Sequence, residues 1–324
     1  MVLITGGAGY IGSHINKQLS KQGYNTILLD NLVYGHEEAV KWGEFVKGDL
    51  SNLELLDEIF SKHKIDTVFH MAAYAYVGES VKNPAKYYRN NVVCSLNLLE
   101  TMLRHNVQKI VFSSTCATYG APLSVPITED MPQNPINPYG ASKLMIERIL
   151  KDYEAAYGIN HAALRYFNAA GADPHAEIGE SHTPETHLIP LALAAAAGDI
   201  PCLEVYGTDY PTPDGSCVRD YIHVTDLADA HVRAMDYINT KKESLQVNLG
   251  NSKGYSVLDV IKAARSVTGN DFPVEYKARR EGDPPELIGS RERAANLLGW
   301  KPQFDEINTI IAHAWSWYKT NNRY

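Results

Sequence analysis

The stretch VLITGGAGYIGSH, residues 2–14, decides the fold of this chain. Its first four residues predict a short buried strand, and a helical pattern follows from residue 11 to residue 22. Gly6, Gly9 and Gly12 lie between the two. Glycine allows a sharp turn there and lets a pyrophosphate approach the backbone N–H groups at the start of the helix. The stretch therefore predicts dinucleotide binding, with a tight turn that binds nothing as the alternative interpretation.

A carboxylate follows the glycine motif at a suitable distance. Asp30 ends a second predicted strand, residues 25–30. A carboxylate at this place accepts hydrogen bonds from the adenosine ribose and repels a 2′-phosphate, so NAD is favoured over NADP. Asp49 and Leu50 end the third predicted strand and suit an adenine contact, although Asp49 alone could cap a helix.

Strand and helix patterns alternate through the first half of the chain. Strands are expected at 2–5, 25–30, 45–50, 67–73, 109–115 and 162–168, and helices at 11–22, 52–63, 85–105 and 137–158. This alternation predicts an α/β fold, a Rossmann-like doubly wound parallel sheet with helices on both faces. We expect an NAD-binding domain from 1–168 and roughly 216–250. A smaller α/β substrate-binding domain would comprise roughly 169–215 and 251–324.

Composition and charge exclude several classes of function. The formal net charge is -8, which argues against nucleic acid or an anionic membrane as the main partner. Four cysteines lie far apart and form no Cys-x-x-Cys pair, so neither a disulfide framework nor a zinc site is expected. The longest apolar run, 188–197, is too short to span a bilayer. A cytoplasmic location is expected.

Tyr139 and Lys143 lie one helical turn apart after Asn137, a plausible N-cap, and Pro138 at the first helical position. Ionising a tyrosine near neutral pH requires its pKa to fall by about three units, or about 4 kcal/mol. An ammonium roughly 4 Å away could supply that much. We therefore expect Lys143 to lower the pKa of Tyr139. The second Tyr-x-x-x-Lys, at 237–241, ends an amphipathic segment and is expected to be structural.

The motifs, taken in order, resemble those of the extended short-chain dehydrogenase/reductase superfamily. The glycine turn, HMAA at 70–73, SST at 113–115 and PYGASK at 138–143 carry this likeness. The chain resembles the UDP-galactose (UDP-glucose) 4-epimerases still more closely, over essentially its whole length. The closer likeness rests on GGAGYIGSH, YVGES, YYRNN, RYFNAAGADP, GTDYPTPDGSCVRDYIHVTDLADAH and RREGDPPE.

The resemblance implies an activity. Tyr139 would take the proton of the sugar 4-hydroxyl while hydride passes from C4 to NAD+, Thr115 would share that proton, and Lys143 would assist. The hydride would then return to the opposite face of the 4-keto sugar. Related dehydratases carry acidic residues just after this threonine. Here those positions are Cys116 and Ala117, so no acid for elimination is present.

The resemblance and the motifs together give a set of candidate site residues. Those expected to bind NAD are Gly6, Gly9, Tyr10, Ile11, Gly12, Asp30, Asn31, Asp49, Leu50, Met71, Ala72, Ala73, Asn90, Ser113, Tyr139, Lys143 and Tyr166. Those expected to bind the UDP-sugar are Thr115, Asn168, Leu188, Arg219, Arg280, Asp283 and Leu287.

Three positions depart from the family's better-studied members. Ala75 stands where a lysine near the NAD phosphates is commonly expected, which could weaken NAD retention. Glu185 and His187 receive no role, because PETHLIP replaces an asparagine-rich motif. No metal is expected, since no ligand spacing near His187 supports one.

Two alternatives remain open. The AYVGES and SSTCATYG stretches also resemble UDP-pentose 4-epimerases, which interconvert UDP-xylose and UDP-arabinose. A non-catalytic NAD-binding regulatory protein is a more distant alternative, because such proteins typically lose the tyrosine or the lysine. The expected partners are UDP-glucose or UDP-galactose and a second copy of the chain as a homodimer.

Overall fold

The computed structural model describes residues 1–280 and 283–321. Its main sheet has seven parallel strands in the order β11-β6-β5-β4-β1-β2-β3. The strands are β1 (Val2–Thr5), β2 (Thr26–Asp30), β3 (Glu44–Lys47), β4 (Thr67–His70), β5 (Lys109–Thr115), β6 (Asn160–Tyr166) and β11 (Leu245–Leu249). The predicted Rossmann-like α/β fold is confirmed.

The strand order reverses next to β1. Val2 pairs with Thr26 of β2 on one side and with Thr67 of β4 on the other. In such a sheet the chain leaves neighbouring strands toward opposite faces, and a crevice opens at their carboxyl ends. The glycine turn after β1 lies in this crevice. The local sequence therefore places the predicted dinucleotide site where the topology also predicts a ligand.

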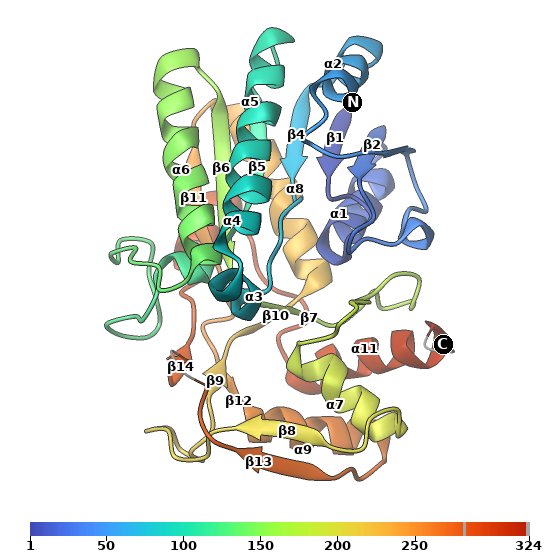
Figure 1. The fold of residues 1–324 in the computed structure, drawn as a ribbon, viewed down its shortest axis with the longest axis vertical. Helices are drawn as coiled ribbons and strands as arrows, with labels where there is room; N and C mark the ends of the chain where they lie inside the picture. The colour runs from blue at the N-terminus through green and yellow to red at the C-terminus, as the bar shows by residue number, and fades with distance from the viewer. Residues whose placement is uncertain (281–282, 322–324) are drawn as a thin grey trace.

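Helices cover both faces of the sheet (Figure 1). On one face, α1 (Tyr10–Lys21) and α8 (Val224–Lys241) pack into an apolar cluster with β1, β6 and β11. On the other face, α2 (Leu53–Lys62), α5 (Cys94–Arg104) and α6 (Pro138–Tyr157) pack into a second cluster. The predicted caps of α6 are present, because the Asn137 side chain accepts from the Gly140 N–H and Gly158 adopts a left-handed φ of 73°.

The single helix expected at 85–105 is wrong, because a π-helical turn interrupts it. The segment divides into α4 (Pro84–Tyr87), a π-helix (Tyr88–Val93) and α5. Within the turn, the buried Asn91 accepts from Tyr74 N at 2.9 Å and donates to Tyr74 O at 3.0 Å. It also donates to the Ser142 hydroxyl at 3.1 Å. The wider turn thus fixes the segment after β4 against α6.

A second group of elements lies below the sheet in Figure 1. It has its own apolar cluster, built around α7 (Leu188–Ala197), α9 (Val257–Thr268) and α11 (Ile307–Asn321). Smaller elements complete it or border the sheet: α3 (Val77–Lys82), α10 (Glu292–Leu298), β7 (Asn168–Ala170), β8 (Leu203–Tyr206), β9 (Val218–Arg219), β10 (Tyr221–His223), β12 (Tyr255–Ser256), β13 (Val274–Lys277) and β14 (Glu286–Leu287).

Several strand ends differ from the sequence-based expectation. The strands expected at 45–50 and 67–73 end at Lys47 and His70, so Asp49 and Leu50 follow β3 instead of ending it. The strand expected at 162–168 ends at Tyr166, and Asn168 begins the separate strand β7. The segment expected to open the substrate-binding domain contains α7 and β8. Among the described residues, no helix combines the length and hydrophobicity that crossing a membrane requires.

Candidate active site

A cavity of about 580 Å³ runs along the carboxyl ends of the central strands. All the residues predicted to bind NAD contribute to its lining, from the glycine turn to Tyr166. Of the residues predicted to bind the UDP-sugar, Thr115, Asn168, Asp283 and Leu287 line the same cavity. Leu188, Arg219 and Arg280 are not part of the lining. One continuous space therefore joins the predicted dinucleotide residues to the predicted reacting residues.

The glycine turn leaves no room for side chains. Gly6 has a φ of +71°, and a Cβ there would lie 2.6 Å from the Ala72 backbone nitrogen. A Cβ on Gly12 would lie 2.1 Å from the carbonyl oxygen of Gly6. The helix that follows begins after Gly9 without a side-chain cap, so its first N–H groups remain available to an anion. These features fit a dinucleotide pyrophosphate.

Asp30 lies at the end of β2, where the ribose contact is predicted. Its carboxylate accepts from Ala8 N at 3.0 Å and from Leu32 N at 2.9 Å, while burial raises its pKa. Nearby, Asn31 donates to Asp49 Oδ2 at 2.6 Å. The backbone thus holds Asp30 in place, and two residues predicted to contact the adenosine lie together.

Lys143 and Tyr139 reach the cavity from the first turns of α6. Lys143 is 2% exposed and donates to the Ser113 carbonyl oxygen at 2.7 Å. Burial lowers the pKa of Lys143 to about 7 and raises the pKa of Tyr139 to about 12, against a hydrogen bond with Thr115 that lowers it. The predicted fall in the Tyr139 pKa is therefore wrong for the protein alone. The reason is that burial of the Tyr139 phenol disfavours its charged form.

A buried ion pair beneath these residues was not predicted. Arg165 of β6 lies 2.7 Å from the Glu147 carboxylate of α6, and their side chains are 3% and 2% exposed. Ser114 donates to Glu147 at 2.5 Å, and Arg165 donates to the Tyr119 hydroxyl at 2.8 Å. The network joins β5, β6 and α6 next to the reacting residues. Its one sequence signal is Arg165, which follows the apolar run of residues 162–164 within the strand.

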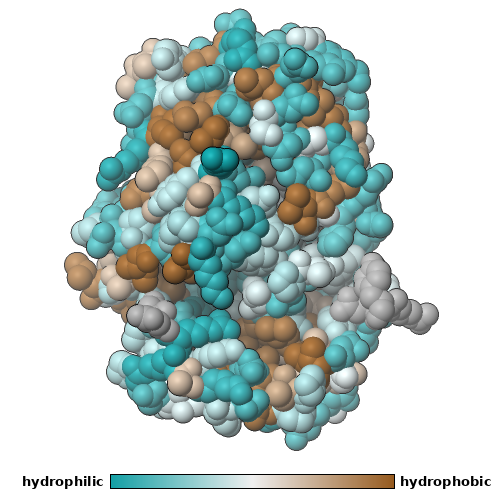
Figure 2. Space-filling view, in the orientation of Figure 1, coloured by the Kyte–Doolittle hydropathy of each residue, from teal (hydrophilic) through white to brown (hydrophobic). Residues whose placement is uncertain are grey.

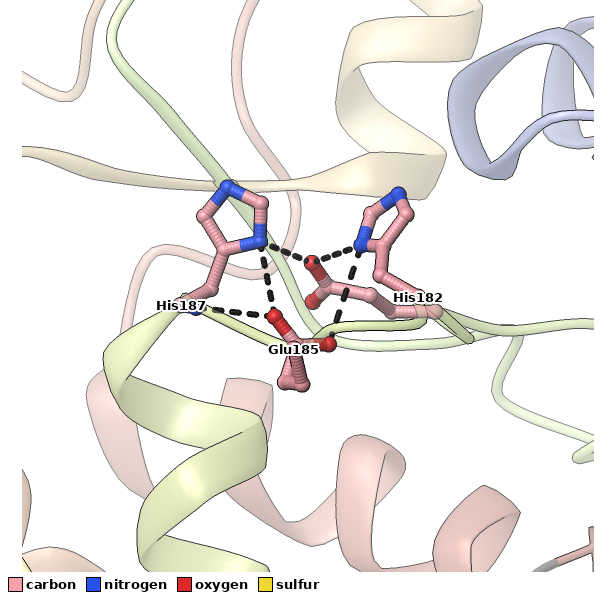
Figure 3. A group of neighbouring side chains, drawn as sticks. His182, Glu185 and His187 are labelled. Atoms are coloured by element: carbon pink, nitrogen blue, oxygen red, sulfur yellow. Dashed lines mark hydrogen bonds and ion pairs between the residues drawn. The ribbon is translucent and has the colours of Figure 1, made fainter. Parts of the chain in front are cut away.

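The segment between β7 and α7 brings further unpredicted side chains to the cavity. Glu180, His182 and His187 line it, and Glu185 lies beside them (Figure 3). Burial would lower the pKa of both histidines, but the two carboxylates outweigh it. They raise the pKa of His182 to about 9 and that of His187 to about 10. Both imidazoles are therefore cationic near neutral pH.

The three remaining candidates lie outside the cavity lining. Arg219 lies 3.4 Å from the Asp283 carboxylate and donates to Val218 O at 2.9 Å. The exposed Arg280 stacks with its guanidinium 4.0 Å from the centre of the Tyr206 ring. Leu188 packs against the apolar cluster around α7. Glu281 and Gly282 of the RREGDPPE motif lie outside the described residues.

Comparison with known proteins identifies the family. The curated UDP-glucose 4-epimerase of Halalkalibacterium halodurans is 52% identical over 98% of this chain and 95% of its own length. The crystal structure of the Brucella ovis UDP-glucose 4-epimerase in complex with NAD is 51% identical. It superimposes with a TM-score of 0.95 over 97% of each chain. The Bifidobacterium longum UDP-glucose 4-epimerase, solved with NAD+ and UDP, is 40% identical with a TM-score of 0.93, over 99% of this chain and 98% of its own.

The match to the family as a whole extends through the entire parallel sheet. The family model described as "NAD dependent epimerase/dehydratase family" matches residues 2–250, from β1 to just beyond β11. The likeness predicted from the motifs is confirmed, and the chain belongs to the NAD dependent epimerase/dehydratase family.

Proposed function

We propose that this protein is a UDP-glucose 4-epimerase that interconverts UDP-galactose and UDP-glucose with NAD as its resident cofactor. The observation that carries the proposal is the single cavity that joins the glycine turn and Asp30 to Thr115, Tyr139 and Lys143. Full-length relatives that bear this name support it.

The chain's own residues handle the proton while NAD, when bound, supplies the reversible hydride acceptor. In this proposal the phenolate of Tyr139, which lines the cavity, takes the proton of the sugar 4-hydroxyl and later returns it. The hydrogen bond with Thr115 lowers the pKa of Tyr139, and the positive nicotinamide ring would lower it further. Lys143 is oriented by the Ser113 carbonyl, which positions its ammonium for a ribose hydroxyl.

The two residues that follow Thr115 provide no acid for an elimination reaction. Burial raises the pKa of the Cys116 thiol to about 12, so it neither donates nor accepts a proton readily at neutral pH. Ala117 offers no acid at all. The lack of an acid at these two positions favours removal and return of hydrogen at the same carbon, which is epimerisation.

We assign the UDP-sugar to the part of the cavity that Asn168, Asp283 and Leu287 line. We assign its diphosphate to Arg219 and Arg280, which would turn toward it on binding. In this assignment 1–168 and roughly 216–250 bind NAD, and roughly 169–215 and 251–324 bind the UDP-sugar.

A cytoplasmic location and a homodimer belong to the same proposal. Figure 2 shows hydrophobic surface over α5 and α6. The exposed apolar side chains of the described residues include Val93, at the end of the π-helical turn, and Met145 of α6.

Purified protein is expected to convert UDP-galactose to UDP-glucose with no NAD added. The reaction regenerates NAD+, so the cofactor need not leave. Chromatography of the products tests the activity, and denaturation followed by assay of the supernatant should release NAD. Recovery of mainly NADP would contradict the ribose role of Asp30. Turnover of UDP-xylose alone would favour a pentose epimerase, and no turnover of any UDP-sugar would overturn the proposed function.

Leu287→Ser is expected to raise the relative efficiency on N-acetylated sugars. Leu287 lines the cavity and packs against a small apolar cluster that includes Cys116, the residue after Thr115. Forcing an extra group into a filled volume costs about 1–3 kcal/mol, so the wild type should prefer UDP-galactose over UDP-N-acetylgalactosamine by about tenfold or more. The ratio of kcat/KM for the two sugars, in wild type and variant, measures this.

The matched control for Leu287→Ser is Leu123→Ser, on an exposed loop side chain. That variant should leave the sugar preference unchanged. Equal kcat/KM for both sugars in the wild type would show that Leu287 does not limit the size of the sugar. The same conclusion would follow if Leu287→Ser left the ratio of the two kcat/KM values unchanged.

A further inference from the structure

Four potential metal ligands converge in the segment between β7 and α7. The His187 Nδ1 atom lies 2.7 Å from Glu180 Oε1 and 3.1 Å from Glu185 Oε1. The His182 Nδ1 atom lies 3.2 Å from Glu180 Oε1 and 3.7 Å from Glu185 Oε2. One ligand atom from each residue lies within 4.8 Å of all the others. In Figure 3 each of the two imidazoles points its Nδ1 atom toward the two carboxylates.

We propose that Glu180, His182, Glu185 and His187 bind one divalent transition-metal ion, with Zn²⁺ as the best fit. Zinc bonds of about 2.0–2.2 Å in a tetrahedron place neighbouring ligand atoms about 3.3–3.6 Å apart. The four nitrogen–oxygen separations, from 2.7 to 3.7 Å, lie around that value. Small side-chain movements would therefore admit the ion. Imidazole nitrogens favour zinc, nickel, cobalt or copper over Mg²⁺ and Ca²⁺.

An unsatisfied atom supports an ion at the centre of this group. The Nδ1 atom of His182 is buried and has no hydrogen-bond partner of adequate geometry among the described residues, although a carboxylate oxygen lies 3.2 Å away. A metal ion needs only the lone pair of that nitrogen.

The kinds of side chain in the group also suit a divalent ion. Two carboxylates among the four ligands would balance its charge. The proposal differs from the sequence-based expectation of no metal. His182, Glu185 and His187 lie close together in the sequence, but only the fold of the segment brings Glu180 to them as a fourth ligand.

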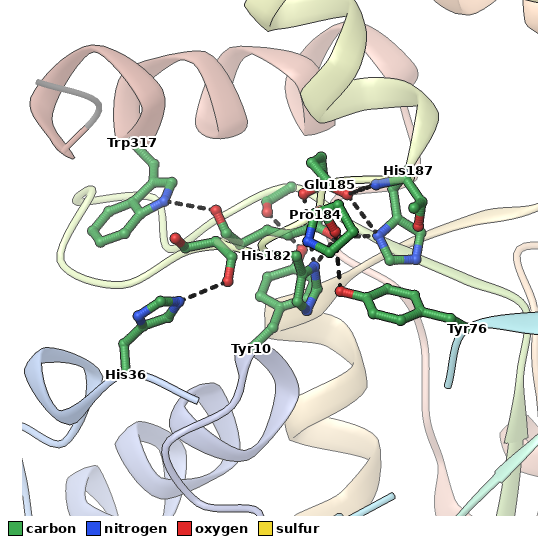
Figure 4. Close-up of polar contacts among 12 residues, drawn as sticks. Tyr10, His36, Tyr76, His182, Pro184, Glu185, His187 and Trp317 are labelled. Atoms are coloured by element: carbon green, nitrogen blue, oxygen red, sulfur yellow. Dashed lines mark hydrogen bonds and ion pairs between the residues drawn. The ribbon is translucent and has the colours of Figure 1, made fainter. Parts of the chain in front are cut away.

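The backbone around the four ligands is already held in place. Glu185 Oε1 accepts from the N–H groups of Thr186 at 2.7 Å and His187 at 2.8 Å. Side chains from three other parts of the chain bond the segment's carbonyl groups (Figure 4): His36 to Ser181 at 3.0 Å, Tyr76 to Pro184 at 3.1 Å and Trp317 to Glu180 at 3.1 Å. Outer contacts of this kind orient metal ligands and strengthen binding.

The ion would have a structural role beside the cofactor. The His182 ring lies edge-on to Tyr10 with centroids 6.4 Å apart, and Tyr10 begins the helix after the glycine turn. A bound metal would hold the segment 180–187 in contact with the glycine turn. We therefore expect the metal to raise thermal stability.

The experiment uses the full chain without a histidine tag, treated with a chelator and then freed of it. Calorimetric titration with Zn²⁺ should show one equivalent per chain, and Mg²⁺ should not bind. Co²⁺ should give the intense visible absorption of a tetrahedral site. His182→Gln and His187→Gln should each weaken Zn²⁺ binding by more than about 10-fold. Zn²⁺ should raise the Tm of the wild type but not that of these variants.

His105→Gln is the matched control. His105 Nε2 lies 3.0 Å from an Asp57 oxygen, a similar pair that lacks converging partners, so Zn²⁺ binding should be unchanged. Glu185→Gln, which keeps the shape of the side chain, provides a second variant if a histidine variant does not fold by circular dichroism. Absence of a one-to-one Zn²⁺ complex, or its persistence in the His182→Gln/His187→Gln protein, overturns the proposal. Neither result depends on epimerase turnover.

Discussion

Tyr139→Phe is expected to lower the turnover of UDP-galactose by about 10² to 10⁴. The substitution removes the phenolic oxygen that accepts the sugar proton and keeps the ring that lines the cavity. Burial already raises the pKa of Tyr139 to about 12, so the wild type depends on nearby positive charge to use this group at neutral pH. Steady-state kinetics measures the loss.

Binding of UDP should survive in Tyr139→Phe, because the groups assigned to the diphosphate lie elsewhere. Tyr237→Phe is the matched control. Tyr237 also precedes a lysine by four residues, but its hydroxyl donates to Glu243 at 3.2 Å on the surface, and its loss should change turnover little. Near-normal turnover in Tyr139→Phe would show that another group is the base. Loss of UDP binding would show that the variant disturbs the site as a whole.

Arg165→Met is expected to lower the free energy of unfolding by about 3–5 kcal/mol. It removes the partner of Glu147 and leaves a carboxylate buried between β5, β6 and α6. The hydrogen bonds from Ser114 and Gln133 would not replace the lost positive charge. Urea unfolding at neutral pH, followed by circular dichroism, measures the change.

Two comparisons separate this effect from an ordinary loss of contacts. Asp57→Ala breaks the Arg104 pair, whose side chains are 44% and 43% exposed, and should cost about 1 kcal/mol or less. The double variant Glu147→Leu/Arg165→Met should recover much of the stability, because no uncompensated charge remains. If Arg165→Met is as mild as Asp57→Ala, the buried pair is not a main support of the site.

The pH dependence of the buried pair has a defined sign. Burial raises the pKa of Glu147, but Arg165 and the surrounding hydrogen bonds outweigh it and the pKa is lowered. The stabilisation is therefore complete above the ordinary glutamate pKa of about 4.3 and is lost as the pH falls through the lower folded value.

The parts of the site that the sequence predicted are those in which function follows from local structure. Gly6, Gly12 and Asp30 are recognisable because a turn and a strand end need those residue types wherever the chain continues. Tyr139 and Lys143 lie on one helical turn, so their spacing is itself the geometry. For each of these residues, the few neighbouring residues in the sequence are enough to predict the position of its side chain.

The parts that escaped prediction depend on tertiary contacts. Arg165 and Glu147 belong to different elements, and only the packing of α6 on the sheet shows that they pair. Glu180 joins His182 and His187 because its segment folds back on itself. The Tyr139 pKa was predicted in the wrong direction for the protein alone, because burial, which the sequence does not give, raises it.

The π-helical turn at Tyr88–Val93 has a consequence for how this chain can vary in length. Such a turn holds one residue more than an α-helical turn, so deleting one residue would restore a regular helix. The residues on either side would keep the faces that they now present, because the wide turn absorbs the extra residue. Only the turn itself would change: Asn91 would lose its two hydrogen bonds to Tyr74, and Asn90 would no longer line the cavity. This helix can therefore change in length by one residue without rotating its two ends relative to each other, but it would lose the side chains that the turn presents.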